Sequence, residues 1–176
     1  MSADTIVPKQ FRIDIEEGQR LRGWITNSYA QIEFMLGDFI LRCAQFAEYA
    51  EHTKTLPHGA PDRVKRVRAI VNKNGPAARF SNELKQILDQ FEARHETRNL
   101  LAHGFCVYLY TPDGDAALQF QKWHRQPSRN DARLIRQFRL SEMQTEMESF
   151  SKMAQDAMVL FQKIHTHFGW AARPDA

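Results

Sequence analysis

The sequence predicts a mainly α protein, in which an up-and-down bundle of about four helices carries a small inserted β-hairpin or three-stranded sheet. Two observations lead to this fold class. Apolar residues recur every three or four positions through long stretches near both ends of the chain, which is the period of an amphipathic helix. Between residues 105 and 124 the period changes to two, which is typical of strands. Short connections between the helical stretches favour antiparallel neighbours.

Length and composition are those of one folded domain. The 176 residues are 43% hydrophobic with a net charge of +3, so we expect a single domain over 1–176 with flexible tails at 1–12 and 170–176. The mildly basic balance is compatible with a phosphate-bearing partner but does not require one. No run approaches the ~18 apolar residues of a membrane span, and the first residues lack a signal-peptide pattern. We therefore expect a cytoplasmic protein that does not bind membranes.

The first long helix is predicted from about 14 to 52, with Asp14 and Glu17 as its N-terminal cap pair. After a loop at 53–61 that is rich in proline and glycine, a short second helix is predicted over 62–72, capped by Asp62. The stripe of the long helix steps by three and four through Ile25, Ser28, Ile32, Leu36, Phe39, Cys43, Phe46 and Ala50.

The third helix, predicted from about 78 to 103, carries an interrupted apolar stripe. The stripe begins with Phe80, Leu84, Ile87, Leu88 and Phe91. Its continuation passes through His95, Arg98 and Ala102, so that an arginine and a histidine stand where leucines are expected. Burying such groups is costly unless they are paired or face a cleft. Gly104 then ends the helix, as glycine often does just past the last turn.

Strand patterns follow at 105–110 and 116–124, joined by a turn. Residues 134–140 form either a third strand or a short helix. Ser141 with Gln144 makes a capping box for the last helix. The stripe of that helix is typical of a core or a dimer seam rather than of cofactor contacts, and it runs through Met143, Met147, Phe150, Ala154, Ala157, Phe161, Ile164 and Phe168.

Arg98, Asn99 and His103 form the pattern Arg-Asn-x-x-x-His at the end of the third helix. In the context RNLLAHG, this resembles the R-x4–6-H motif of the HEPN superfamily, in which a polar residue, often asparagine, commonly follows the arginine. The resemblance implies an HEPN-like bundle and, as in the RNase members, metal-independent RNA cleavage that leaves a 2′,3′-cyclic phosphate. It also implies a homodimer with a composite cleft. A toxin of a toxin–antitoxin or defence system, with an antitoxin as partner, fits the same resemblance.

The three side chains suit that chemistry. The imidazole of His103 can move a proton near neutral pH. The guanidinium of Arg98 can clamp a phosphate and stabilise its growing charge, and the amide of Asn99 can orient either group. DNA lacks the 2′-OH, so only RNA could be cut in this way. No Walker loop, dinucleotide fingerprint or zinc-ligand pattern is present, so we expect neither a metal nor a cofactor.

The alternative is a non-catalytic HEPN-like module that binds RNA, a nucleotide or a protein, because fold alone does not determine function. In one toxin branch of the family the motif reads R-x4-H-x-Y, and the tyrosine is modified by a nucleotidyltransferase antitoxin. Phe105 stands at that position here, so modification at this site is not expected.

Several residues outside the motif are candidates for supporting roles. Glu33 borders the stripe of the first helix and is either a boundary residue that reaches solvent or a partner of Arg98. His95 is expected to be a packed or cleft-facing helper. The second helix has a basic face that is either solvated or in contact with phosphates, and it comprises Arg63, Lys65, Arg66 and Arg68.

Aromatic residues and the remaining histidines have simpler interpretations. For Trp123 and Tyr108, core packing is favoured over the stacking of bases. His165 and His167 are two positions apart and do not share a helix face, so we expect surface residues rather than metal ligands.

Overall fold

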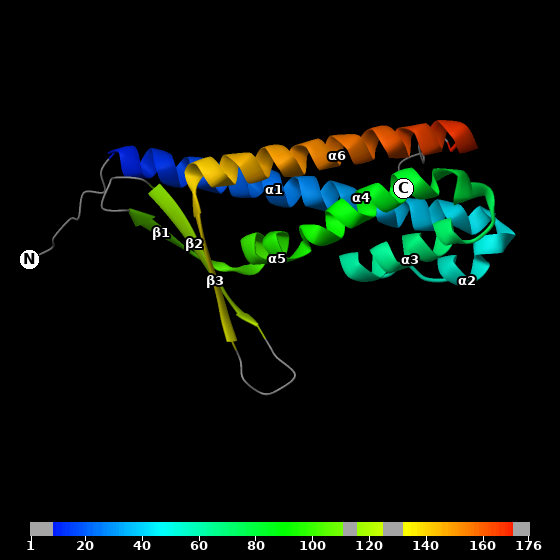
Figure 1. Ribbon diagram of the computed structural model, residues 1–176, viewed down its shortest axis with the longest axis horizontal. Coiled ribbons are helices and arrows are strands. Elements are labelled where there is room, and N and C mark those ends of the chain that lie inside the picture. Colours follow the sequence, from blue (N-terminus) through cyan, green and yellow to red (C-terminus); the bar gives the residue numbers. More distant parts are fainter. Residues whose placement is uncertain (1–8, 111–115, 125–131, 171–176) are drawn as a thin grey trace, which may run out of the picture. The chain divides into compact units, whose positions relative to one another are not determined.

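The computed structural model describes residues 9–110, 116–124 and 132–170, and the chain divides into two compact units. Unit 1 comprises Met1–Asn27 and Glu96–Ser151, and unit 2 comprises Ser28–His95 and Lys152–Ala176. The two longest helices therefore each contribute residues to both units (Figure 1). The prediction that residues 1–176 form one domain stays a prediction.

The described residues are mainly helical and include one three-stranded antiparallel sheet, which confirms the predicted fold class. The α-helices are α1 (Lys9–Arg42), α2 (Ala50–Thr53), α3 (Ala60–Asn72), α4 (Ser81–Ala93), α5 (His95–His103) and α6 (Leu140–Phe168). Short 3₁₀ turns are η1 (Cys43–Gln45), η2 (Ala47–Tyr49) and η3 (Pro76–Phe80). The strands are β1 (Phe105–Tyr110), β2 (Ala116–His124) and β3 (Ala132–Arg139).

Helix α1 begins earlier than predicted. Because it starts at Lys9, residues 9–12 are helical rather than part of a tail, and residues 1–8 lie outside the described part. The cap predicted at Asp14 is wrong, since this residue lies inside the helix. Its carboxylate accepts hydrogen bonds from Gln10 Nε2 at 2.9 Å and from the hydroxyl of Tyr110 at 2.6 Å.

Helix α1 also ends ten residues before the predicted boundary, at Arg42 rather than 52. Phe46 has an extended backbone, with φ −100° and ψ 120°, and its ring packs against those of Tyr49, Phe168 and Trp170. The gain from this aromatic cluster accounts for the interruption. Trp170, predicted to begin a tail, is part of the cluster and stacks on Phe168 with ring centroids 4.8 Å apart; residues 171–176 lie outside the described part.

Helix α3 begins at Ala60, with Gly59 as its N-cap and without a side-chain cap, so the predicted cap at Asp62 is wrong. Asp62 lies in the first turn, where a carboxylate still interacts favourably with the helix dipole. Apolar residues of α3 are buried in unit 2, and these are Ala60, Val64, Val67, Ile70 and Val71.

The predicted third helix is divided at Arg94. Its backbone, with φ −99° and ψ −1°, leaves the helical path, and its N–H bonds to the carbonyl of Phe91 at 3.3 Å. The buried apolar face of α4 does not continue in register into α5. Helix α5 is buried through Leu100 and Leu101, so the predicted continuation of the stripe through Arg98 is wrong. The division places Arg98 in a half-buried position without requiring it to replace a core leucine.

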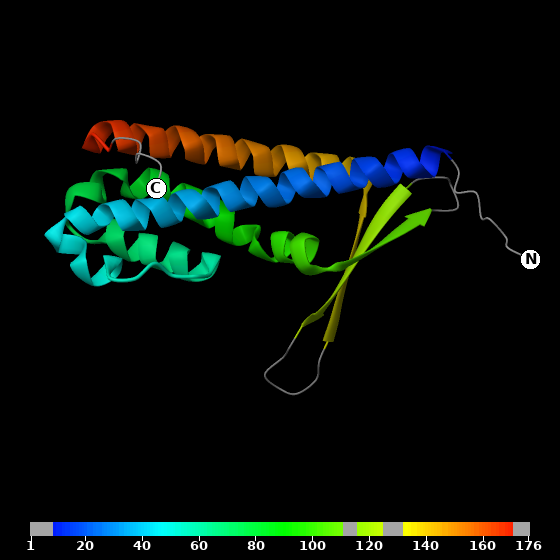
Figure 2. The same ribbon diagram turned by 180° about the vertical axis from the view of Figure 1, so that it is seen from behind.

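The strand order is β1-β2-β3, and residues 132–139 are a strand, which decides between the two predicted alternatives (Figure 2). Residues paired across neighbouring antiparallel strands point to the same face. One face, here called the inner face, carries the buried Leu118, Phe120 and Phe138. Leu118 lies against α1 at Gly18, where a Cβ atom would come within 2.8 Å of its Cδ2. Glycine at this position allows the sheet to approach the helix closely.

Helix α6 begins at Leu140, so the capping box predicted for Ser141 and Gln144 is wrong. Instead, Glu142 accepts a hydrogen bond from the backbone N–H of Arg139 at 2.8 Å, which is the reciprocal half of a capping box, shifted by two residues. The predicted core stripe of α6 is confirmed. Its most buried members are Met143, Phe150, Ala154, Ala157, Phe161 and Ile164.

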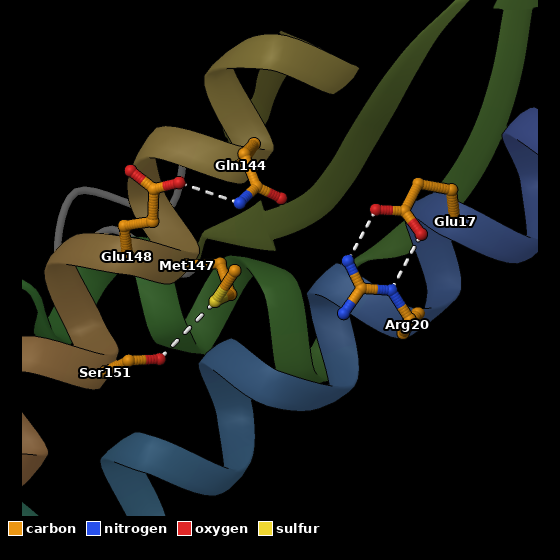
Figure 3. Close-up of polar contacts among 6 residues, drawn as sticks. All are labelled: Glu17, Arg20, Gln144, Met147, Glu148 and Ser151. Atoms are coloured by element: carbon orange, nitrogen blue, oxygen red, sulfur yellow. Dashed lines mark hydrogen bonds and ion pairs between the residues drawn. The ribbon is translucent and has the colours of Figure 1, made fainter.

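Side chains one turn apart interact on α1 and on α6 within unit 1 (Figure 3). On α1, Arg20 Nη2 lies 2.6 Å from Glu17 Oε1. On α6, Gln144 donates to Glu148 at 2.8 Å, and the hydroxyl of Ser151 donates to the sulfur of Met147 at 3.4 Å. The two exposed pairs contribute about a few tenths of a kcal/mol each. The burial of α1, α6 and the inner sheet face therefore dominates the stability of the unit.

Replacing Tyr49 by phenylalanine is expected to destabilise the protein by about 1–3 kcal/mol. The hydroxyl of Tyr49 accepts a hydrogen bond from the buried N–H of Ala77 at 2.8 Å, and phenylalanine would leave that donor unsatisfied. Urea unfolding followed by circular dichroism measures the effect. The matched control is Tyr110→Phe, because that side chain is exposed, and its expected change is within about 0.5 kcal/mol. Equal changes in the two variants would contradict the prediction.

Candidate functional site

The three motif residues lie together on α5, within unit 1. Arg98 and Asn99 are half-buried, and His103 is exposed at the last position of the helix. Arg98 Nη1 donates a hydrogen bond to the Oδ1 of Asn99 at 2.9 Å. The amide of Asn99 therefore contacts the neighbouring guanidinium, and its orienting role in a reaction stays a prediction.

The helical geometry of α5 separates Arg98 from His103. Both residues belong to the same helix, and five residues at 100° per residue turn their side chains about 140° apart. A single copy of α5 thus directs the cation and the imidazole to different sides.

Gly104 ends α5 as predicted, but for a different reason from the usual one. Its φ is not in the left-handed region, which among the described glycines is found at Gly169. Its N–H donates to the carbonyl of Leu100 at 2.7 Å, and a Cβ atom would lie well inside van der Waals contact of that same oxygen. The close approach requires glycine, and β1 begins directly after this residue, at Phe105.

Arg22 of α1 binds the C-terminal end of the motif helix. Its Nε donates to the carbonyl of Leu101 at 2.6 Å and its Nη2 to that of Ala102 at 3.4 Å. These carbonyls belong to the last turn, where helical partners are lacking and a cation is favoured by the helix dipole. The guanidinium also lies 5.5 Å from the ring centroid of Phe120. Arg22 therefore ties together α1, α5 and the sheet.

Arg136 of β3 reaches the first half of the motif helix. Its Nη1 donates to the hydroxyl of Thr97 at 3.0 Å, and its Nη2 lies 3.9 Å from a carboxylate oxygen of Glu146. The guanidinium lies 4.5 Å from the ring centroid of Phe138. A second cation, Arg136, is therefore bound to Thr97, the residue that precedes Arg98. The sequence did not indicate the contact of Arg22 or that of Arg136 with this helix, because each joins residues far apart in the chain.

His95 and Glu33, the predicted supporting residues, belong to unit 2. His95 is half-buried, and its Nδ1 lies 2.7 Å from the hydroxyl of Tyr29, whose ring stacks on Phe91 at 3.9 Å. It is thus packed against Tyr29, and a supporting role for it in the site stays a prediction. The carboxylate of Glu33 lies 3.8 Å from Arg63 Nη1. Its pairing with Arg98 stays a prediction.

The basic face predicted on α3 also belongs to unit 2, and its arginines make contacts within that unit. Arg63 donates to the carbonyls of Pro57 and Glu33, and Arg66 to that of His52. Arg68 binds both Asp89 and Glu92 of α4. Lys65 is exposed. Phosphate binding by these four residues stays a prediction, and a phosphate would compete with the contacts described.

No protein-family model, curated protein or solved structure matches this chain. Among the described residues, no helix is long and apolar enough to cross a bilayer. The same residues contain no group of three or more histidine, cysteine or acidic side chains that could hold a metal ion.

The C-terminal histidines differ in their surroundings. His167 is exposed, as predicted, and lies 3.2 Å from Arg79. His165 is half-buried, and its Nε2 lies 3.2 Å from Asp38 Oδ2, so its predicted surface position is only partly correct. Burial and the nearby Arg42 lower the pKa of His165, while Asp38 opposes that shift.

Both cysteines are free thiols. Burial raises the pKa of Cys43 to about 12 and raises that of Cys106 as well. Thiols with raised pKa values are poor nucleophiles near neutral pH. Neither cysteine is therefore a candidate for catalysis.

Two aromatic residues of the sheet, Trp123 and Tyr108, differ in their exposure. The predicted core packing of Trp123 is wrong, because 70% of its surface is exposed. Tyr108 is half-buried on the inner face, and burial raises the pKa of its hydroxyl. The alternation of a short strand does not reveal which of its faces is covered, so the sequence could not distinguish these two positions.

Proposed function

We propose that this protein is a metal-independent endoribonuclease of HEPN type. The observation that carries the proposal is the arrangement on α5: Arg98 is held by Asn99 through a 2.9 Å hydrogen bond, and His103 is exposed at the end of the same helix. A fixed guanidinium suits a phosphate, and an accessible imidazole suits proton transfer.

The reaction uses the nucleophile that RNA itself provides. His103 takes the proton of a ribose 2′-OH, and the 2′ oxygen forms a bond to the adjacent phosphorus. The bond from phosphorus to the 5′ oxygen of the next nucleotide breaks, and that oxygen is protonated by water. Arg98 binds the non-bridging oxygens and stabilises the charge that grows on them. The products are a 2′,3′-cyclic phosphate and a 5′-hydroxyl end.

The proposal includes a homodimer in which two copies of α5 complete the site. It is supported by the angle of about 140° between Arg98 and His103 on one helix. In a two-fold dimer each copy of the motif meets its counterpart, so the arginine of one copy can act with the histidine of the other. A biological role as the toxic half of a toxin–antitoxin pair, or as another defence protein, belongs to the same proposal.

Incubation of the purified protein with single-stranded RNA in EDTA tests the activity. We expect cleavage to continue in the chelator and to give cyclic phosphate ends, because the proposed reaction needs no metal. The 5′-hydroxyl ends are detected by labelling with polynucleotide kinase without prior phosphatase treatment. The matched control is the same RNA incubated with the Arg98→Ala variant, purified free of contaminating ribonucleases. Cleavage abolished by EDTA, or an absence of cleavage in every buffer together with retained RNA binding, would contradict the proposal and favour a non-catalytic module.

A further inference from the structure

The face of the sheet opposite the inner face carries exposed large apolar side chains at one end, whereas Ala117 on the same face is buried. By the strand register, this outer face comprises Phe105, Val107, Leu109, Ala117, Gln119, Gln121, Trp123, Arg133, Ile135, Gln137 and Arg139. Phe105 and Trp123 are each 70% exposed, and Ile135 is 43% exposed. Exposed apolar side chains grouped on one face often mark an interaction site.

These three side chains are neighbours. Phe105, Gln121 and Ile135 are paired across the three strands, and Trp123 pairs with Arg133 in the next row of the same face. Diagonal neighbours on one face of an antiparallel sheet lie about 7–8 Å apart, so the rings of Phe105 and Trp123 are near each other. Together they form an aromatic platform with an arginine at its edge.

The charged residues of the outer face are Arg133 and Arg139, and its other polar residues are Gln119, Gln121 and Gln137. The described strand residues of this face therefore include no carboxylate. A second copy of the chain would bring another arginine-bearing face against it, and like charges oppose such pairing. A polyanion with exposed aromatic rings is complementary to both the arginines and the platform.

We propose that the outer face binds single-stranded RNA, with bases stacked on Trp123 and Phe105 and the backbone near Arg133. Stacking on aromatic side chains requires bases that are not paired in a duplex. Phe105 is the first residue of β1 and is separated from His103 by Gly104 alone. Two residues span at most about 7 Å, so a strand bound here would pass close to the histidine. The choice of RNA rests on the proposed function.

Binding of a strand that cannot be cut tests this inference separately from cleavage. The probe is a fluorescently labelled strand of about 12 2′-O-methyluridines, a length within the site sizes of known single-strand binders, and the readout is fluorescence anisotropy. We expect Trp123→Ala and Phe105→Ala each to weaken binding roughly tenfold or more. Trp123→Phe, which keeps an aromatic ring, should retain most of the affinity. Because both residues are largely exposed, these variants should fold, and circular dichroism checks that they do.

The matched control is Trp24→Ala, which removes an equally large side chain that is 51% exposed on α1. Its affinity should stay within about twofold of that of the wild type. Equal affinity of Trp123→Ala and Trp24→Ala would overturn the inference, as would equal binding of duplex and single-stranded probes. If Trp123→Ala instead turned a dimer into a monomer with unchanged binding, the face would be an interface between copies. A protein that binds through Trp123 but never cuts RNA would contradict the proposed function alone.

Discussion

A one-to-one mixture of Arg98→Ala and His103→Ala protein is expected to recover RNA cleavage that neither variant shows alone. Loss of the imidazole should lower the rate by about 10²–10⁴, and loss of the guanidinium by about 10²–10³. If each site takes Arg98 from one copy and His103 from the other, a mixed dimer holds one intact site. Random exchange makes half of the dimers mixed, so the mixture should recover about a quarter of the wild-type activity.

The control variants for this experiment replace exposed residues outside the motif helix. Mixing Arg20→Ala with His58→Ala protein should leave activity at the wild-type level, because both side chains are solvent-exposed and lie outside α5. Sedimentation of each variant establishes that dimers form and exchange. Two inactive variants that form mixed dimers without any recovery would show that the arginine and histidine act within one copy. Monomers alone at micromolar concentration would contradict the composite site.

Gly104→Ala should be one of the most damaging single substitutions in the chain. The added Cβ would collide with the carbonyl oxygen of Leu100, which is a backbone atom and cannot move without altering the last turn of α5. We expect a loss of stability of about 3 kcal/mol, at the upper end of the usual cost of overpacking, together with a large loss of RNA cleavage because His103 is displaced. Urea unfolding and the RNA digest measure the two effects.

Gly23→Ala is the matched control, because Gly23 lies inside α1 and a Cβ there would meet nothing within 4 Å. Alanine in an exposed helical position should stabilise the protein by about 1 kcal/mol relative to glycine. Opposite signs for the two glycines are therefore predicted. A Gly104→Ala variant as stable as the wild type would contradict the account of how α5 ends.

The spacing of apolar residues predicted the helices and strands, because an element that is buried on one face needs apolar residues at its own period. The stripe of α6 and the period of two after Gly104 are clear cases, and both correspond to observed elements. The breaks at Arg42 and Arg94 were not predicted. The first depends on an aromatic cluster that includes Trp170, more than a hundred residues away, and the second involves no proline or glycine. Such tertiary preferences leave little trace in local sequence.

Some residues of the candidate site could likewise be predicted from the sequence, and others could not. Arg98, Asn99 and His103 were recognisable because they lie within six residues of one helix. Arg22 and Arg136, which hold that helix at its two ends, were not, because their partners are 79 and 39 residues away. The exposure of Trp123 was also missed, since alternation along a strand gives two equivalent faces and only packing determines which one is covered.

A single 2′-deoxyribose placed at a mapped cleavage position tests the central claim most directly. The oligoribonucleotide is digested in EDTA alongside the unmodified strand, and the products are separated at single-nucleotide resolution. Because the 2′-OH of that ribose is the proposed nucleophile, cleavage at the modified linkage should disappear, while cleavage at other linkages continues. Continued cleavage at the modified linkage would mean that water or a side chain attacks the phosphate, and would contradict the mechanism assigned to Arg98 and His103.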